Sequence, residues 1–175
     1  ISFTDGSVPN SGALNGWAWD FGDPASGPLN TSNLQNPMHV YAAAGSYNVT
    51  LTVTTDKGCT SNPIANVPVT INHRPEAGFI VPDVCINDVA TVFTDTSKIA
   101  VGTINRPLNE WNFGDPGSGP LNNQIQQNGS HLYPAPGIYQ VRQIVTSALG
   151  CKDTIILPIT INSADPVSNF TVVNS

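Results

Sequence analysis

The stretch that decides the fold is Trp17–Asn30, WAWDFGDPASGPLN, because the chain contains most of it a second time. The second copy is Glu110–Asn122, EWNFGDPGSGPLN, in which Trp111 stands 92 positions after Trp19. Both copies keep a Trp, a Phe, a Gly-Asp-Pro and a Ser-Gly-Pro-Leu-Asn in the same order. A duplication of this length predicts an internal repeat in which each copy forms one structural unit.

The repeat extends well beyond these two stretches. Phe3 matches Phe93 at an offset of 90, and Phe79 matches Phe170 at an offset of 91, so a third copy begins near the end of the chain. The matches predict three segments. They are a first domain at 1–72 whose N-terminal strand is missing from this chain, a second domain at 75–162, and a linker with the start of a third repeat at 163–175.

Within each unit the residues alternate as they do in a half-buried β-strand. Tyr47, Val49, Leu51 and Val53 alternate with polar residues, so we expect one face in the core and the other in water. The sequence Asp56-Lys57-Gly58 predicts a hairpin-type turn. No segment of ten or more residues has a convincing helical periodicity. Short strands joined by turns predict an all-β fold of tandem immunoglobulin-like antiparallel β-sandwiches.

The second unit departs from this alternation at Gln143, which stands where the first unit has Leu51. A buried amide must find hydrogen-bond partners or reach a sheet edge. We therefore expect local looseness in the second unit.

The repeated motif itself has a structural explanation. Trp19 and Phe21 have the same parity on a strand, so both can fill the core of a sandwich. Gly22-Asp23-Pro24 should then end the strand, because proline cannot donate to the ladder and aspartate caps turns locally. Trp17 has the same parity but is replaced by Asn109 in the second unit, so we expect it near the sandwich end or partly exposed.

These residues resemble the PKD domain, an immunoglobulin-like β-sandwich named for the polycystic kidney disease protein. The family pattern is Trp-x-Phe-Gly-Asp, then His-x-Tyr, then Gly-x-Tyr leading into a long alternating strand. The first unit carries it as Trp19, Phe21, Gly22, Asp23, His39, Tyr41, Gly45 and Tyr47. The second unit carries it as Trp111, Phe113, Gly114, Asp115, His131, Tyr133, Gly137 and Tyr139. The chain departs from the family at Pro24 and Pro116, where Gly is commoner, and at Asn112, which replaces the Asp found at Asp20.

The resemblance narrows further, because FGDPxSGPLN followed by a Gly-Cys is similar to tandem PKD repeats of large surface proteins in Bacteroidetes-type bacteria. Such proteins include gliding adhesins and cargo of the type IX secretion system. The resemblance implies display and adhesion, with the repeats acting as a stalk.

The composition excludes some functions. Charged residues are 10% of the chain and the net charge is −6, so no basic surface for nucleic acid is expected. No apolar run approaches the roughly 20 residues of a membrane-spanning helix, so membrane insertion is not expected. Low charge and abundant hydroxyl and amide side chains favour a secreted or cell-surface location.

The three cysteines are Cys59, Cys85 and Cys151. The repeat offsets place the first-unit copy of Cys85 upstream of Ile1, and the third copy just past Ser175. Each full repeat should therefore carry two cysteines, so we predict a disulfide between Cys85 and Cys151, with Cys59 unpaired in this chain because its partner is missing from it. The loop closed by the Cys85–Cys151 disulfide would contribute roughly 4 kcal/mol in the chain-entropy model. The alternatives are three free buried thiols, or a Cys59–Cys85 bridge that leaves Cys151 unpaired.

Calcium is the main alternative to a purely structural role for the acidic residues. Oxygen ligands from two segments of a unit could converge on Ca²⁺. The candidate ligands are Asp5, Ser7, Asp20, Asp23, Asp95, Ser97 and Asp115. Against this, aspartate before a turn usually satisfies backbone N–H groups, and Asn112 weakens the second set.

No catalytic set is present in the sequence. His39 and His131 belong to different units, and each is expected to form a hydrogen bond in its own domain. Ser26 and Ser118 recur without a repeated base beside them, which is typical of turn serines. No other cofactor is expected.

Three functions follow. The first is a non-catalytic structural or adhesive repeat of a large secreted or cell-surface protein, a rigid spacer that contacts neighbouring repeats and also protein or glycan. The second is a carbohydrate- or protein-binding accessory module of a secreted hydrolase, with Trp17 as the candidate surface aromatic. The third is self-association into an extracellular fibre by strand addition between chains.

Overall fold

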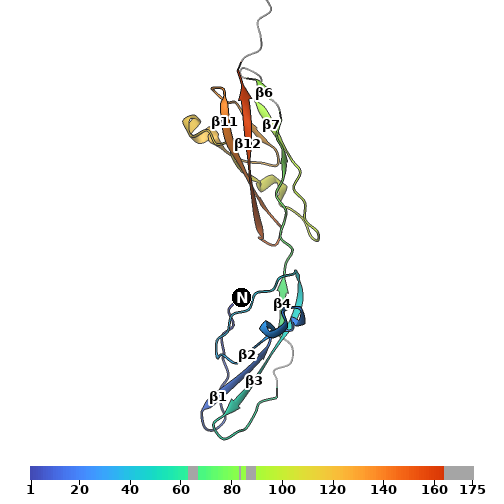
Figure 1. Ribbon diagram of the computed structural model, residues 1–175, viewed down its shortest axis with the longest axis vertical. Helices are drawn as coiled ribbons and strands as arrows, with labels where there is room; N and C mark the ends of the chain where they lie inside the picture. Colours follow the sequence, from blue (N-terminus) through green and yellow to red (C-terminus); the bar gives the residue numbers. More distant parts are fainter. Residues whose placement is uncertain (63–66, 83, 86–89, 164–175) are drawn as a thin grey trace, which may run out of the picture. The chain divides into compact units, whose positions relative to one another are not determined.

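The chain forms two compact units, Ile1–Asn72 and a second that begins at His73 (Figure 1). The computed structural model describes residues 1–62, 67–82, 84–85 and 90–163. The segment expected to open a third repeat lies, from residue 164 onward, outside the described residues.

Unit one is built on a four-stranded antiparallel sheet. In spatial order the strands are β2 (Thr31–Ser32), β1 (Leu14–Asp20), β3 (Gly45–Thr55) and β4 (Val67–Ile71). The segment from Ile1 to Ser7 packs on this sheet through Phe3, whose ring centroid lies 5.6 Å from that of Trp19. A bridge between Ser2 and Met38 ties the segment to the rest of the unit.

The described residues of unit two form two sheets, which pack as a sandwich. The larger sheet, in spatial order, consists of β6 (Val84–Cys85), β12 (Lys152–Asn162), β11 (Gly137–Thr146), β8 (Glu110–Asn112) and β9 (Asn123–Ile125). The smaller sheet consists of β10 (Gly129–His131), β7 (Thr91–Asp95) and β5 (Phe79–Ile80). All pairs are antiparallel except β6 with β12. The predicted all-β, immunoglobulin-like antiparallel fold is confirmed.

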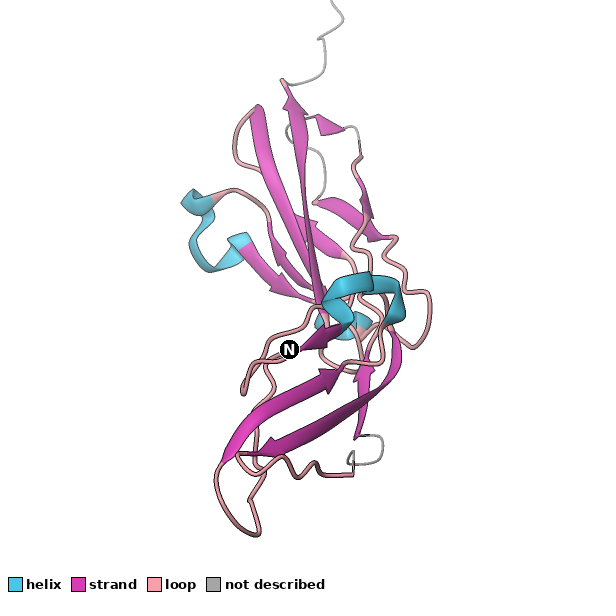
Figure 2. Ribbon diagram, turned by 60° about the horizontal axis from the view of Figure 1, so that its bottom comes forward, coloured by secondary structure: helices cyan, strands magenta, loops and turns pink. Residues whose placement is uncertain are grey.

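Short 3-10 helices connect strands at positions where the sequence shows no helical periodicity (Figure 2). They are η1 (Pro24–Asn30), η2 (Arg106–Leu108) and η3 (Pro116–Asn122). Prolines at the first helical positions and glycines within η1 and η3 account for their short, kinked form. Gly27 (φ 58°, ψ −124°) and Gly119 (φ 59°, ψ −126°) adopt backbone angles that only glycine adopts readily. Among the described residues there is no helix whose length and hydropathy would let it span a bilayer.

The core of unit two is the larger of the two. In unit one the buried cluster is Trp19, Phe21, Val49 and Leu51, with Phe3, Trp17, Tyr41, Val53 and Val69 partly buried against it. In unit two the buried cluster is Phe79, Val84, Phe93, Trp111, Phe113, Tyr133, Val141, Ile159 and Ile161. Phe93 is fully buried, whereas its counterpart Phe3 is half-buried. The parity prediction for Trp19 and Phe21 is confirmed, because both side chains are buried in the core.

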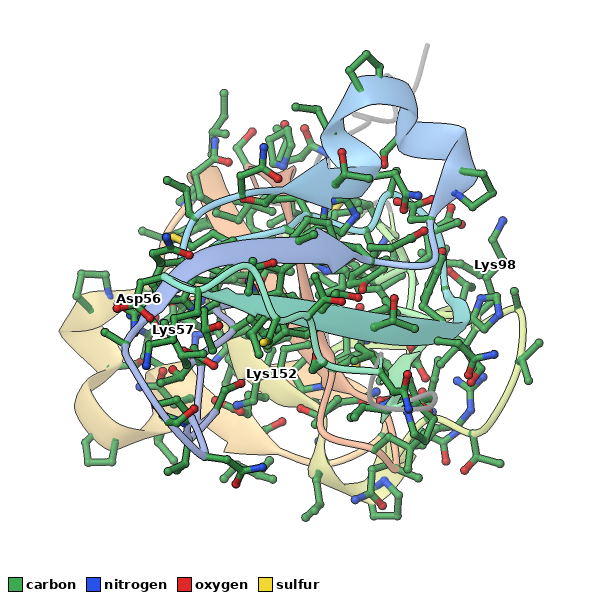
Figure 3. The ribbon with its side chains drawn as sticks, turned by 90° about the horizontal axis from the view of Figure 1, so that it is seen from below. Asp56, Lys57, Lys98 and Lys152 are labelled. Atoms are coloured by element: carbon green, nitrogen blue, oxygen red, sulfur yellow. The ribbon has the colours of Figure 1, made fainter. Side chains whose placement is uncertain are left out.

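The few charged residues lie mainly at the surface. Lys98 is 3.4 Å from Glu76, and Lys152 is 2.9 Å from Glu110, both pairs within unit two and exposed. Figure 3 labels these two lysines, together with Asp56 and Lys57 at the turn that follows β3. Exposed pairs of this kind contribute about 1 kcal/mol or less, so surface charge does not account for the stability of either unit.

Candidate functional site

The motif residues of unit one form a continuous stack of rings. Phe21 lies between Trp19 and His39, with ring centroids 6.5 Å and 4.4 Å away and nearly parallel planes. Tyr41 meets His39 edge-on at 4.5 Å and contacts Tyr47 at 4.1 Å. The Tyr41 hydroxyl donates to the Phe21 carbonyl at 2.9 Å. Each motif position therefore has an internal partner, which is what a packed core requires.

Unit two contains the same stack of rings, with closely similar distances between them. Phe113 lies 4.7 Å from His131, and His131 meets Tyr133 edge-on at 4.6 Å. The Tyr133 hydroxyl donates to the Phe113 carbonyl at 3.1 Å. Burial raises the pKa of Tyr133 well above its ordinary value, and the nearby carboxylate of Asp115 adds to the shift. The phenol therefore stays protonated and remains a donor at any physiological pH.

The motif aspartate does not cap its turn, which corrects the sequence interpretation. Asp23 makes no side-chain cap, and its carboxylate lies 3.0 Å from His39 Nε2 in a buried pair. The corresponding distance from Asp115 to His131 is 2.9 Å. The expectation that each histidine forms a hydrogen bond within its own unit is confirmed. The local turn in unit one is instead capped by Asp20, whose Oδ1 accepts from Gly22 N at 2.8 Å.

The remaining motif residues close the loop that follows the strand. Asn30 Oδ1 accepts from Asp23 N at 2.5 Å, and Asn122 Oδ1 accepts from Asp115 N at 2.7 Å. Ser26 Oγ donates to the carbonyl of Asp23 at 2.8 Å, so it is a turn serine as expected. The motif therefore recurs because both units need the same hydrogen bonds to hold the loop that follows this strand.

Asp5 and Asp95 anchor a second polar cluster in their respective units. In unit one, Asp5 Oδ2 accepts from Trp17 Nε1 at 2.7 Å, and Asp5 Oδ1 accepts from Ser7 N at 2.9 Å. Partial burial opposes ionisation of Asp5, but hydrogen bonds from Ser7, Trp17 and Gln35 outweigh it, so the pKa of Asp5 lies below its ordinary value.

In unit two, Arg106 and Gln143 bind the equivalent carboxylate. Gln143 Nε2 donates to Asp95 Oδ1 at 2.9 Å, and the Arg106 guanidinium pairs with Asp95 Oδ2. Burial again opposes ionisation, but Ser97, Gln143 and Arg106 outweigh it, so the pKa of Asp95 is also lowered. Gln143 is fully buried and has partners, so the expectation of local looseness at this position is wrong. Arg106 comes from η2, which lies between Phe93 and Trp111, where the offset between the two units rises from 90 to 92, so the second unit has two extra residues there. Nothing in the repeat pattern predicted its role.

The candidate calcium ligands are occupied by protein donors. Asp20 accepts from Gly22 and Asn30, while Asp23 and Asp115 pair with histidines. The Ser97 hydroxyl bonds to Gly78, and the Ser7 amide binds Asp5. Within the described residues no group of three or more His, Cys, Asp or Glu side chains could hold a metal ion. The geometry therefore gives no support to a calcium site formed by these residues.

Trp17 has a structural role in unit one. Its indole is partly buried against the core, and its N–H is committed to Asp5. The half-buried position agrees with the expectation of partial exposure, but this side chain is poorly suited to be an independent surface contact.

The predicted Cys85–Cys151 disulfide is wrong in this structure. Cys85 in β6 pairs with Asn162, at the end of β12, whereas Cys151 immediately precedes Lys152, at its start. Ten residue steps of a strand span about 33 Å, while bridged Cα atoms lie within about 7 Å. Cys59 is exposed, so the alternative of three buried thiols does not hold either.

A groove opens into the core of unit one, and sequence reasoning did not locate it. Its volume is about 370 Å³, and its lining is largely apolar. The lining residues are Phe3, Thr4, Gly6, Ser7, Trp19, Val49, Thr50, Leu51 and Val67. In unit two the equivalent space holds Phe79, whose ring lies 5.8 Å from Phe93 and 5.2 Å from Trp111.

Comparisons with solved structures find similar folds at low identity. The PKD1 domain of Vibrio anguillarum Epp matches with 19% identity and a TM-score of 0.45, over 54% of this chain and 100% of that one. Fibronectin(III)-like modules of Clostridium thermocellum CbhA match with 13% identity and a TM-score of 0.43, over 95% of this chain and 88% of theirs.

Comparisons of the sequence with known proteins and families find matches at higher identity than those with solved structures. Collagenase ColQ1 of Bacillus cereus (strain Q1) is 40% identical over 81 residues, which is 42% of this chain and 8% of the collagenase. The chain thus corresponds to a small part of that relative's length. The family model for the PKD domain matches twice, at residues 1–71 and 72–161. With nearly its whole length covered by two copies, this chain belongs to the PKD domain family.

Proposed function

We propose that the chain is a structural, non-catalytic repeat module of a large secreted or cell-surface protein, in which tandem PKD domains act as a rigid spacer. PKD domains are non-catalytic modules. The observation that carries the proposal is that, in both units, the side chains of the repeated motif bind to other groups of the same unit. The rings stack on one another, the motif aspartates Asp23 and Asp115 pair with histidines, and the hydroxyls of Tyr41 and Tyr133 donate to backbone carbonyls.

The spacer role is tested by lengthening the array. A polypeptide carrying the 1–162 segment once, twice and three times is measured by small-angle X-ray scattering. The maximum dimension should rise in proportion to copy number, because repeats of this kind contact only their neighbours. A maximum dimension that levels off, as for a collapsed globule, would contradict the proposal.

The second candidate is an accessory module of a secreted hydrolase that binds protein or carbohydrate. The 40% identity to part of a collagenase favours this function. Since Trp17 is committed to Asp5, better surface candidates are Leu29 and Leu121, each 72% exposed at the same position of the repeated loop.

Retention on insoluble collagen and on insoluble glycans tests this candidate. Leu29→Ala with Leu121→Ala should reduce retention at least several-fold, while Leu149→Ala, also 69% exposed, serves as the control. Equal retention of all variants, or none by the parent chain, would leave the spacer function as the better account.

The gliding-adhesin or type IX secretion context is a narrower form of the spacer proposal. It rests on the FGDPxSGPLN and Gly-Cys resemblance. Sequencing the genomic region around the coding segment tests it, through the presence or absence of further PKD repeats and a C-terminal secretion domain.

A further inference from the structure

The larger sheet of unit two has an outer face that points away from the core. Alternate residues of β11 and β12 are turned toward the core, so the residues between them face outward. The outward isoleucines Ile125 in β9, Ile138 in β11 and Ile156 in β12 are 68%, 70% and 55% exposed. Ile144, also outward in β11, is partly exposed. The outer face of this sheet therefore presents apolar side chains from strands on both sides of β8.

Unit one has a similar core position but a different outer face. Val141 of β11 matches Val49 of β3, and both valines are buried. On the outer face, by contrast, the residues of unit one at the matching positions are polar or small. They are Ala18 for Glu110, Asn33 for Ile125, Ser46 for Ile138, Thr50 for Arg142 and Thr52 for Ile144. The sheet of unit one forms without isoleucine at these positions, and exposed apolar side chains gathered on one face mark an interaction surface.

Arg142 and Glu110 lie at the centre of this face. Arg142 in β11 is exposed and forms no ion pair with any residue that the structure describes. Glu110 lies in β8, opposite Ile144 of β11. Its Oε1 accepts from Lys152 Nζ at 2.9 Å, which leaves Oε2 for a second donor. The face therefore has a cation without a partner and a carboxylate oxygen that can bind one.

We propose that this outer face is the interface of a two-fold symmetric dimer, in which it packs against the same face of a second molecule. A two-fold axis that lies in the interface and crosses β11 between Arg142 and Ile144 places each arginine opposite Ile144 of the other molecule. Because Glu110 is the neighbour of Ile144 in β8, the arginine then lies beside Glu110 of the other molecule, and symmetry makes the contact twice. Packed sheet faces lie about 10 Å apart, a distance that an arginine and a glutamate side chain span together.

The composition of the face makes a second copy the fitting partner. Interface cores are depleted in most charged residues but enriched in arginine, and Arg142 has Ile144 and Ile156 as neighbours on the sheet. The carboxylate that Arg142 requires lies on the same face, displaced by one row of the sheet, so the surface is complementary to itself. An isologous interface closes after two molecules. The inference goes beyond the spacer function, because it predicts that two chains associate through unit two.

Sedimentation-equilibrium centrifugation of the full chain, at low ionic strength and under reducing conditions, tests the proposal. The parent chain should show a reversible equilibrium between monomer and dimer. Arg142→Glu should weaken dimerisation at least about tenfold, because the contact occurs twice and becomes repulsive. Lys57→Glu, in the exposed turn after β3, makes the same change in net charge and should leave dimerisation unchanged. A parent chain that is monomeric throughout, oligomers that continue beyond the dimer, or equal effects of the two variants overturn the proposal.

An exchange of charges tests the arrangement of the two faces. Glu110→Arg, like Arg142→Glu, should dimerise poorly by itself, because like charges then meet across the axis. An equimolar mixture of the two variants should restore dimerisation to near the parent value, since each arginine then meets a glutamate. A loss caused only by altered folding of a variant would persist in the mixture. A mixture that remains monomeric overturns the proposed contact between these residues.

The apolar part of the face is tested by a matched pair of substitutions. Ile156→Thr should weaken dimerisation several-fold, because it removes apolar surface from the interface of both molecules. Ile80→Thr is the control, since Ile80 lies in β5 of the smaller sheet and is 56% exposed, against 55% for Ile156. Urea denaturation at concentrations where the parent chain is monomeric separates a loss of stability from a loss of dimerisation. Equal effects of the two substitutions on dimerisation would show that the outer face is not the interface.

Discussion

The Asp115–His131 pair is buried in unit two, so little of either side chain is accessible to water. The two atoms lie 2.9 Å apart, with 7% and 3% of the respective side chains exposed. Replacing Asp115 with Ala leaves the imidazole without that partner, so we expect a loss of about 1–3 kcal/mol in the free energy of unfolding.

Urea denaturation of the full chain measures this loss. Glu110→Ala, which breaks the exposed pair with Lys152, is the control and should cost no more than about 1 kcal/mol. Equal losses in the two variants would show that burial of the Asp115–His131 pair has no energetic consequence.

Asp95 makes the stability of unit two depend on acid pH. Its pKa is lowered in the folded state, so its contribution is present above the unfolded-state value of about 3.9 and is lost as the pH falls through the folded-state pKa. The free energy of unfolding should therefore fall as the pH is lowered from about 5 toward 2. Asp95→Asn should lower stability at pH 7 and flatten this pH dependence. Urea titrations at several pH values measure both, and an unchanged slope in the variant would contradict the prediction.

At the scale of elements, the loop that follows strand β8 requires glycine at position 114, both for its backbone angles and for its close approach to β11. Gly114 has φ 72°, and a Cβ there would lie 2.6 Å from the carbonyl oxygen of Gln140 in β11. Gly150, with φ 82°, has open space at its Cβ position. Both Ala substitutions cost about 1–2 kcal/mol for the left-handed backbone, but only Gly114→Ala adds a clash with the neighbouring strand.

We therefore expect Gly114→Ala to destabilise unit two clearly more than Gly150→Ala does. Thermal unfolding of the two variants beside the parent chain decides this. Similar shifts in melting temperature would mean that the approach of the loop to β11 is not tight in solution.

At the scale of the whole molecule, the two units differ in how completely the core is covered. Unit two buries Phe79 and Val84 over the ring stack, while the equivalent space in unit one is the groove. Burying a large apolar side chain contributes about 1.5–3 kcal/mol, so unit one should be the less stable unit in this chain.

Hydrogen exchange followed by mass spectrometry separates the two units. Amides of β3 should exchange faster than those of its counterpart β11. Equal protection of the two strands would contradict the difference in stability.

The sequence by itself determined the duplication, the all-β class and the ring pair of each core. Parity places Trp19 and Phe21 on one face, and only a regular strand is needed to know it. It did not determine the partner of Asp23, the binding of Asp95 by Arg106, or the separation of Cys85 from Cys151 along β12. These depend on which segments distant in the chain become neighbours, and offsets within a repeat say which residues are equivalent but not which ones meet. The lining of the groove in unit one was decided only by the tertiary structure, because it depends on which side chains of the sheet face the Phe3–Ser7 segment, and no single strand pattern contains that relation.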